Sequence, residues 1–265
     1  MLDIILRTCA SASVPAFGPA ALNPHRICGD DKDLMIRKCL TSLVGSINHC
    51  DHDIKLIILD DHSGAAFLKK MKAILDTCDK PYEIVSLEKK GFNNSAYQQF
   101  LYARNARELA YTVEDDYLHT PDALNEMLYA YYHFKARVGF NDVAIYPFDC
   151  DHRYKVGQER PCKIFYRNNR YWRTNLASSN TLFAHRDIFQ RYFPVFETLA
   201  LEYPSKDESD TINRLYNNLV DCGGPVTLFT PIPSLAVHLT YDEPLEITTA
   251  MFDWREIWDS ITVKE

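Results

Sequence analysis

Three consecutive carboxylates end an apolar segment in the stretch YTVEDDY, residues 111–117. Adjacent acids repel one another unless a cation offsets their charge. Carboxylates at positions i and i+2 of an extended segment, here Glu114 and Asp116, point to the same side. That arrangement suits Mg²⁺ or Mn²⁺ with phosphate oxygens as the remaining ligands. A solvated acidic turn that caps the helix expected after Pro121 is the alternative, and the motif alone leaves both open.

A second acidic motif, Asp60-Asp61-His62-Ser63, follows the apolar run IKLIIL. A carboxylate at this place could accept hydrogen bonds from a nucleobase imide or from ribose hydroxyls. The alternative is that Asp61 or Ser63 caps the following helix.

Two weaker candidates lie in the second half of the chain. Asp207, Glu208 and Asp210 open a stretch with helical spacing, where acids are also stabilised by the helix dipole. His238 ends the apolar run PSLAVH, where a histidine is either a ligand or a structural residue.

The elements that must position these residues alternate in the first half of the chain. Short apolar runs predict buried strands, and longer runs with apolar residues three or four apart predict helices. The order predicts a Rossmann-like parallel sheet covered by helices, with both leading acidic motifs just past the carboxyl ends of strands. The predicted elements are strand Asp3–Cys9, helix Asp30–Asn48, strand Ile54–Leu59, helix Ala65–Thr77, strand Tyr82–Leu87, helix Asn94–Leu109 and strand Ala110–Val113.

The second half is less regular, and no linker separates it from the first. The aromatic and basic stretch 163–173 could line an acceptor site or form an exposed loop or edge strand. Residues 252–258 predict a short amphipathic helix that packs on the core or forms a dimer contact. The other predicted elements are helix Pro121–Val138, strand Val143–Phe148, an apolar then helical run Leu176–Phe193, and helix Ser205–Leu219 capped by Gly223-Gly224.

Composition narrows the class of protein. The chain has 265 residues, 46% of them apolar, and a net charge of -7, which argues against nucleic acid as a partner. Its eight cysteines contain no C-x-x-C pair, and no window reaches the roughly 20 apolar residues of a membrane span. The N-terminus lacks the features of a signal peptide. We therefore expect a cytoplasmic protein with reduced thiols and no transmembrane segment.

Taken together, the motifs resemble those of the GT-A fold nucleotide-sugar glycosyltransferases, most closely the family 2-like group. The opening IILRTC resembles that group's first strand, IKLIILDDHSG its strand ending in two Asp and a Ser, and YTVEDDY its Asp-X-Asp motif. ASSNTLFAHRDIF is similar to its acceptor strand and helix, DESDTINRL to its Glu-Asp helix start, and PSLAVH to its late metal-binding histidine.

The resemblance implies a role for each motif. The fold would be a GT-A type α/β domain over residues 1–265, with a nucleotide-sugar-binding half (1–118) fused to an acceptor-binding and catalytic half (119–265). Two departures stand out: Glu114 replaces the first Asp of Asp-X-Asp, and Glu208 stands where the general base is usually Asp. The implied residues are Thr8, Asp60, Asp61 and Asp115 for the nucleotide, Asp116, His238 and Glu114 for the metal, and Glu208, Asp207 or Asp210 for the base.

The chemistry that these positions would support is sugar transfer. With Mn²⁺ or Mg²⁺ on the donor diphosphate and a carboxylate that deprotonates the acceptor hydroxyl, transfer would invert the anomeric centre. The partners would be a nucleoside-diphosphate sugar and a glycan, lipid-linked or small-molecule acceptor, and the chain could form a homodimer. A nucleotidyltransferase with a related sheet and a non-catalytic nucleotide- or sugar-binding module are the alternatives.

Overall fold

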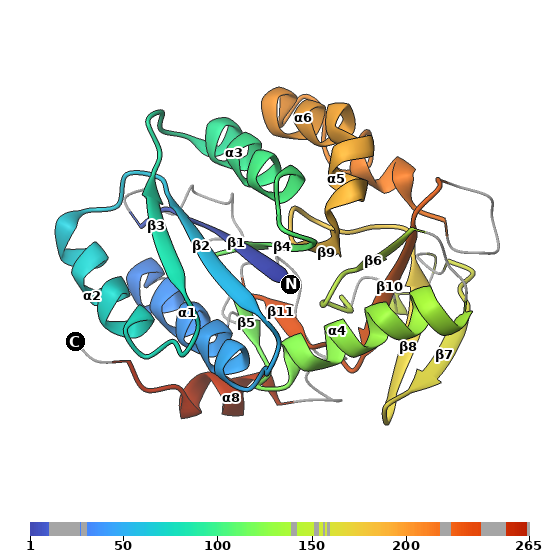
Figure 1. Ribbon diagram of the computed structural model, residues 1–265, viewed down its shortest axis with the longest axis horizontal. Helices are drawn as coiled ribbons and strands as arrows, with labels where there is room; N and C mark the ends of the chain where they lie inside the picture. The colour runs from blue at the N-terminus through green and yellow to red at the C-terminus, as the bar shows by residue number, and fades with distance from the viewer. Residues whose placement is uncertain are drawn as a thin grey trace.

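Nine strands form one central sheet in the order β3-β2-β1-β4-β9-β6-β10-β8-β7 (Figure 1). The computed structural model describes residues 1–10, 27, 31–138, 142–150, 154, 155, 157, 160–217, 224–239 and 253–263. The strands of this sheet are β1 (Leu2–Thr8), β2 (Ile54–Asp60), β3 (Tyr82–Ser86), β4 (Leu109–Glu114), β6 (Val143–Ile145), β7 (Ile164–Arg167), β8 (Arg170–Asn175), β9 (Leu182–His185) and β10 (Thr227–Ile232).

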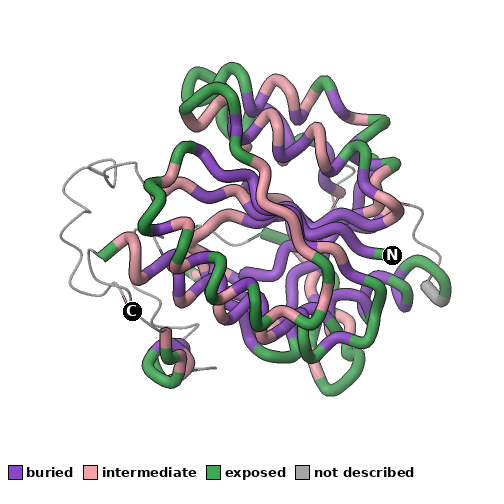
Figure 2. The backbone as a smooth tube through the Cα atoms, turned by 60° about the vertical axis from the view of Figure 1, so that its left-hand side comes forward, coloured by how far each residue is buried: buried purple, intermediate pink, exposed green. Residues whose placement is uncertain are grey.

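The first four strands run parallel, as the sequence predicts. β1 pairs in register with β2 on one side and with β4 on the other, and β3 adds to the outer edge of β2. The near-continuous apolar sequences of β1 and β2 are buried on both faces, which is the pattern of a parallel strand between two helical layers (Figure 2). The predicted α/β fold with a mostly parallel central sheet is therefore confirmed.

Helices cover both faces of the sheet. Figure 1 shows one group with α3, α5 and α6 above the strands, and a second group with α1, α2 and α4 below them. The described helices are α1 (Lys32–Asn48), α2 (Ala65–Leu75), α3 (Phe92–Arg104), α4 (Ala123–His133), α5 (Arg186–Arg191), α6 (Phe193–Glu202) and α8 (Trp254–Ser260).

The far half of the sheet has mixed directions. β9 lies antiparallel between β4 and β6, and β8 is antiparallel to β10. The aromatic stretch 163–173 forms the β7–β8 hairpin, with Phe165 packed against the core and Tyr166 exposed. Its two-residue turn, Asn168 and Asn169, has φ of 51° and 60°, values that fit a type I′ turn and that asparagine tolerates. The hairpin is thus an edge of the sheet, one of the two outcomes that the sequence left open.

A two-stranded ribbon lies outside the main sheet. β5 (Tyr117–His119) pairs antiparallel with β11 (Ala236–His238), so His238 lies opposite Tyr117. The ribbon joins the residues directly after β4 to a segment near the end of the described chain.

Two of the predicted helices differ from the structure. The helix expected over Asn94–Leu109 ends at Arg104, and Leu109 already belongs to β4. The helix expected over Ser205–Leu219 does not form: turns follow α6, then a short 3₁₀ helix at Ile212–Leu215. The Asp207 carboxylate accepts the backbone amides of Ser209 and Asp210, a local side-chain bond that competes with helical pairing. Residues 218 and 219 of the predicted helix and Gly223 of its predicted cap lie outside the described residues.

Smaller differences concern the helix and strand ends. A π-helical turn at Phe134–Val138 follows α4, and β6 is shorter than the predicted strand Val143–Phe148. Near the C-terminus, α8 forms as expected and buries Trp254 and Trp258, while Phe252 lies outside the described residues. Among the described residues, no helix has the length and apolar character needed to cross a membrane.

Candidate functional site

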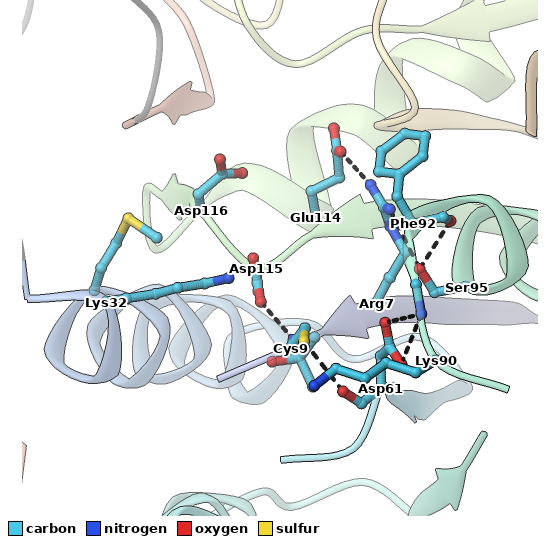
Figure 3. A pocket seen from close by; sticks show the side chains of 13 residues that line it. Arg7, Cys9, Lys32, Asp61, Lys90, Phe92, Ser95, Glu114, Asp115 and Asp116 are labelled. Atoms are coloured by element: carbon cyan, nitrogen blue, oxygen red, sulfur yellow. Dashed lines mark hydrogen bonds and ion pairs between the residues drawn. The ribbon is translucent and has the colours of Figure 1, made fainter. Parts of the chain in front are cut away.

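The β1–β4 pocket, a cavity of about 290 Å³, lies where the carboxyl ends of β1 and β4 meet (Figure 3). From β1 the chain proceeds outward through β2 and β3, and then returns to place β4 on the other side of β1. Such a reversal of strand order opens a crevice in which α/β sheets bind ligands. The pocket is lined by Arg7, Thr8, Cys9, Lys32, Met35, Asp61, Lys90, Gly91, Phe92, Ser95, Glu114, Asp115 and Asp116.

Asp61 fixes the loop that leads into α3. Its carboxylate accepts the backbone amide of Gly91 at 2.9 and 3.2 Å and lies 3.0 Å from Nδ1 of His62. Gly91 has φ of 118°, a conformation that side-chain-bearing residues rarely adopt. The Asp61 side chain is only 4% exposed, so its orientation in the pocket is set before any ligand arrives.

Thr8 and Asp60, both predicted nucleotide ligands, lie in different situations. Thr8 lines the pocket, and its buried Oγ1 has no hydrogen-bond partner among the described residues. Asp60 does not line the pocket: its carboxylate accepts the amide of Ser63 at 3.2 and 3.3 Å and closes the turn after β2. The structure therefore brings Thr8, but not Asp60, to the pocket.

Glu114 is held by an arginine of the neighbouring strand. Arg7 lies opposite Glu114 in the β1–β4 register, and its guanidinium forms an ion pair with that carboxylate. The Arg7 guanidinium also stacks over the ring of Phe92, with its carbon 4.4 Å from the ring centre. In Figure 3 the Glu114 carboxylate points toward Arg7, and Asp116 extends away from this pair.

Asp115 lines the pocket between the end of β1 and the start of α1. Its carboxylate accepts the backbone amide of Cys9 at 2.9 Å. The pKa of Asp115 is raised to about 6, mainly by burial and in part by the charge of Asp116, against the lowering effects of Lys32, the Cys9 amide and Arg7. Lys32 extends toward Asp115 in Figure 3, so the pocket holds cations that can face an anionic ligand.

Asp116 and His238, 122 positions apart, meet across the β5–β11 ribbon. His238 Nε2 lies 2.9 Å from Asp116 Oδ2, and the His238 ring stacks on Tyr117 at 4.9 Å. The backbone closes the same contact, since the amide of Leu239 donates to the carbonyl of Asp116. Two of the three predicted metal ligands, Asp116 and His238, are thus side by side as an oxygen donor and a nitrogen donor, and Asp116 lines the pocket.

The predicted bases lie in the turn after α6. Burial raises the pKa of Glu208, and the nearby carboxylates of Glu114 and Asp207 raise it further, while His238 lowers it. Glu208 is therefore close enough to Glu114 and His238 for their charges to change its pKa. Asp207 and Asp210 are exposed, and the Asp207 carboxylate is engaged with its own turn.

The pocket contains residues that the motifs did not indicate. Arg7, Lys32, Lys90 and Phe92 all line it. Two of them leave a trace in the sequence: Arg7 interrupts an apolar strand, and Lys32 stands in the first turn of a helix, where the dipole disfavours a cation. A charge in an unfavourable local position is the signal that could have identified them.

Sequence comparisons find no match, either among family models or among curated proteins. Among solved structures, S. aureus TarS overlaps with a TM-score of 0.48 at 12% identity over 86% of this chain and 36% of TarS. The galactosyltransferase LgtC, in complex with donor and acceptor sugar analogs, overlaps with a TM-score of 0.49 at 11% identity, covering 99% of this chain and 97% of LgtC. The mannosyltransferase PcManGT from Pyrobaculum calidifontis, in complex with GDP-Man and Mn²⁺, overlaps with a TM-score of 0.35 at 13% identity, covering 57% of this chain and 36% of PcManGT.

LgtC and PcManGT are sugar transferases, the class that the sequence motifs resemble. The chain spans about a third of TarS and 53–59% of the shorter TarS 1-349 chains.

Proposed function

We propose that this protein is a metal-dependent glycosyltransferase that moves a sugar from a nucleoside diphosphate to an acceptor hydroxyl with inversion. The observation that supports it best is the Asp116–His238 pair, 2.9 Å apart beside a pocket that also holds Asp61 and Asp115. In this proposal residues 1–118 supply the nucleotide site, and residues 119–265 supply the acceptor site and the base.

The side chains of Asp116 and His238 fit a divalent metal ion such as Mn²⁺ or Mg²⁺. Asp116 offers a carboxylate oxygen and His238 an imidazole nitrogen, a combination that suits Mn²⁺ better than Mg²⁺. Within the described ranges, no three His, Cys, Asp or Glu residues group as a metal site. A two-residue set leaves coordination positions for phosphate oxygens, and when bound, the ion would offset the charge of the leaving diphosphate. Glu114, which is paired with Arg7, is the weakest of the predicted ligands.

The nucleotide would lie along the carboxyl ends of β1 and β2. Thr8 Oγ1 is a buried hydroxyl that can bond to the ligand, and the fixed Asp61 carboxylate can accept from a base imide or a ribose hydroxyl. Asp115 is a second carboxylate that would accept hydrogen bonds from the hydroxyls of the ribose or of the donor sugar. Lys32 and Lys90 line the same pocket, where their charge would stabilise the diphosphate.

Glu208 is the base in this proposal. Its pKa is raised mainly by burial, which strengthens a carboxylate as a proton acceptor. It would accept the proton of the acceptor hydroxyl as that oxygen attacks the anomeric carbon from the face opposite the diphosphate, and this attack inverts the centre. Asp207 is exposed and bonded within its turn, so it is the less suitable of the two.

Nucleoside-diphosphate release from a panel of UDP-, GDP- and TDP-sugars with Mn²⁺ or Mg²⁺ tests the proposal. We expect slow release from at least one donor, and at least a 100-fold loss of Mn²⁺-dependent nucleotide affinity in Asp116→Asn. Asp207→Asn is the matched control: it also replaces an aspartate with asparagine, but at an exposed position, and it should retain that affinity. Pyrophosphate release from nucleoside triphosphates would instead indicate a nucleotidyltransferase. Binding without any release, or wild-type affinity in Asp116→Asn, would contradict the proposal.

A further inference from the structure

A second concave site, the α4 groove, lies on the outer face of α4 and has a volume of about 540 Å³. It is defined by His52, Asn125, Glu126, Tyr129, Tyr132 and Asn168, together with the neighbouring His133 and Ala136. None of the described residues that line it lines the β1–β4 pocket.

Flat aromatic rings form one part of this groove. Tyr129 and Tyr132 are 44% and 38% exposed, high values for such large side chains on a folded helix. Each ring is stacked: Tyr132 on His52 at 6.4 Å and 19°, and Tyr129 on His133 at 6.1 Å and 13°. Stacking fixes the rings with little further loss of side-chain entropy on binding, which favours a ligand with a flat apolar face.

Polar groups beside these rings are held in place from two sides. Asn168, in the type I′ turn of the β7–β8 hairpin, donates its side-chain amide to Glu126 Oε1. Glu126 Oε2 is buried and has no hydrogen-bond partner among the described residues. Asn125 donates its side-chain amide to the carbonyl of His49 at 2.7 Å, which orients the remaining amide oxygen. A buried acceptor without a donor is unfavourable, so the groove favours a ligand that brings hydroxyl groups.

We propose that the α4 groove is a saccharide-binding site, separate from the β1–β4 pocket, for an uncharged glycan. Sugars are the ligand class that combines an apolar C–H face for the tyrosine rings with hydroxyl donors for Glu126. The negative charge of the Glu126 carboxylate disfavours a polyanion in this groove. The site does not depend on the proposed glycosyl transfer.

Saturation-transfer NMR with maltohexaose, cellohexaose, chitohexaose and mannohexaose tests this site. We expect saturation of the sugar ring protons for at least one of these four probes. Tyr132→Leu keeps the bulk of the side chain but removes the flat ring, and should weaken binding at least three-fold. Glu126→Gln should weaken it as well, because the acceptor charge is lost.

Two controls make the outcome decisive. Tyr171→Leu removes another exposed tyrosine outside the groove and should leave the saturation unchanged. Asp116→Asn should also leave it unchanged, which distinguishes this site from the metal site and from failure of the proposed function. Sedimentation of each variant reports whether the groove is instead a contact between copies of the chain. No saturation from any probe, equal binding by Tyr132→Leu, or a groove-dependent dimer would overturn the proposal.

Discussion

Glu208 and Asp207 are adjacent carboxylates in different environments. Glu208 is half-buried and is influenced by the charges of Glu114 and His238, whereas Asp207 faces solvent. Partial burial strengthens a carboxylate as a proton acceptor, so in the proposed reaction Glu208 is better suited than Asp207 to act as the base.

Glu208→Gln should therefore reduce kcat by about 10²- to 10⁴-fold, the usual contribution of a general base. Nucleotide affinity should stay within about two-fold of wild type, because a base of this kind does not hold the donor. Steady-state transfer and equilibrium nucleotide titration measure the two effects separately. Asp207→Asn is the matched control, and a larger loss of turnover in that variant would reverse the assignment.

The Arg7–Glu114 pair joins β1 to β4 at the pocket. Both side chains are largely buried, at 11% and 17% exposed. Loss of one partner of a buried ion pair leaves the other charge desolvated and alone, at a cost of about 3–5 kcal/mol.

We expect Arg7→Met to lower the free energy of unfolding by about 3 kcal/mol, and Arg7→Met/Glu114→Met to recover part of that loss. Urea denaturation of the single and double variants provides the measurement. Lys72→Met, which breaks the exposed Lys72–Asp76 pair on α2, should show no comparable change. If Arg7→Met is as stable as the wild type, the pair does not stabilise this edge of the pocket.

At the scale of single elements, the β5–β11 ribbon depends on a buried histidine. The Tyr111 hydroxyl lies 2.8 Å from His119 Nε2, and His119 Nδ1 lies 3.1 Å from the Tyr117 carbonyl. A neutral ring with its proton on Nδ1 satisfies both contacts. Burial lowers the pKa of His119 from an ordinary value of 6.5 to about 4.

This shift predicts acid sensitivity of the fold. Between pH 6.5 and about 4, the unfolded chain binds a proton at His119 and the folded chain does not, so stability falls as pH falls through this range. The stability that depends on neutral His119 is fully present above pH 6.5. Below that pH it falls by about 1.4 kcal/mol for each pH unit, which amounts to roughly 3 kcal/mol by pH 4.

Urea denaturation at pH 7.0 and pH 4.5 measures this loss directly. His119→Gln cannot bind the proton, so its stability should change less between the two pH values than that of the wild type. Equal pH dependence in the two proteins would show that other groups control acid unfolding.

The strands of the first half of the chain are the elements that the sequence predicts most closely. The uninterrupted apolar runs of β1 and β2 leave few alternatives to a buried parallel strand, and the acids behind them mark the carboxyl edge. β9 lies inside the apolar then helical run Leu176–Phe193, but the pairing of this strand could not be predicted in this way. It contributes only four residues and pairs with β4, which is 70 positions earlier, so its place depends on tertiary packing.

The candidate site shows the same division. Asp61, Asp115, Asp116 and His238 were predicted from motifs, and all lie at or beside the pocket. Asp60 ends β2, and its carboxylate accepts the amide of Ser63, so it closes a turn instead of lining the pocket. The alternative in which Asp61 or Ser63 caps the following helix is not what forms, because Gly64 is the N-cap of α2 and, among the described residues, no side chain bonds to that helix end.

For the molecule as a whole, a ligand of the β1–β4 pocket should add stability by linkage. The pocket is lined by residues from β1, α1, β4 and the segments after β2 and β3, so a bound nucleotide connects much of the first half of the chain. At 100 times its dissociation constant a ligand adds about 2.7 kcal/mol, which corresponds to a rise in Tm of roughly 5–10 °C.

We expect this rise for the preferred nucleoside diphosphate with Mn²⁺, and little change with either component alone. Thermal denaturation with UDP, GDP and TDP, each with and without Mn²⁺, measures it. Asp116→Asn should lose the metal-dependent part only. An equal rise without metal would argue that the Asp116–His238 pair does not take part in nucleotide binding.

The position of β9 has a consequence for how the chain must fold. This strand joins the block β3-β2-β1-β4 to the block β6-β10, and both of its neighbours precede it in sequence. Before residues 182–185 are synthesised, the edge of β4 that β9 covers has no partner, and β6 lacks both of its neighbours, β9 and β10. Such edges are templates for intermolecular pairing, so a nascent chain that pauses before this point is exposed to aggregation. The continuity of the sheet between β4 and β6 therefore depends on a four-residue strand that follows both of its partners in the chain.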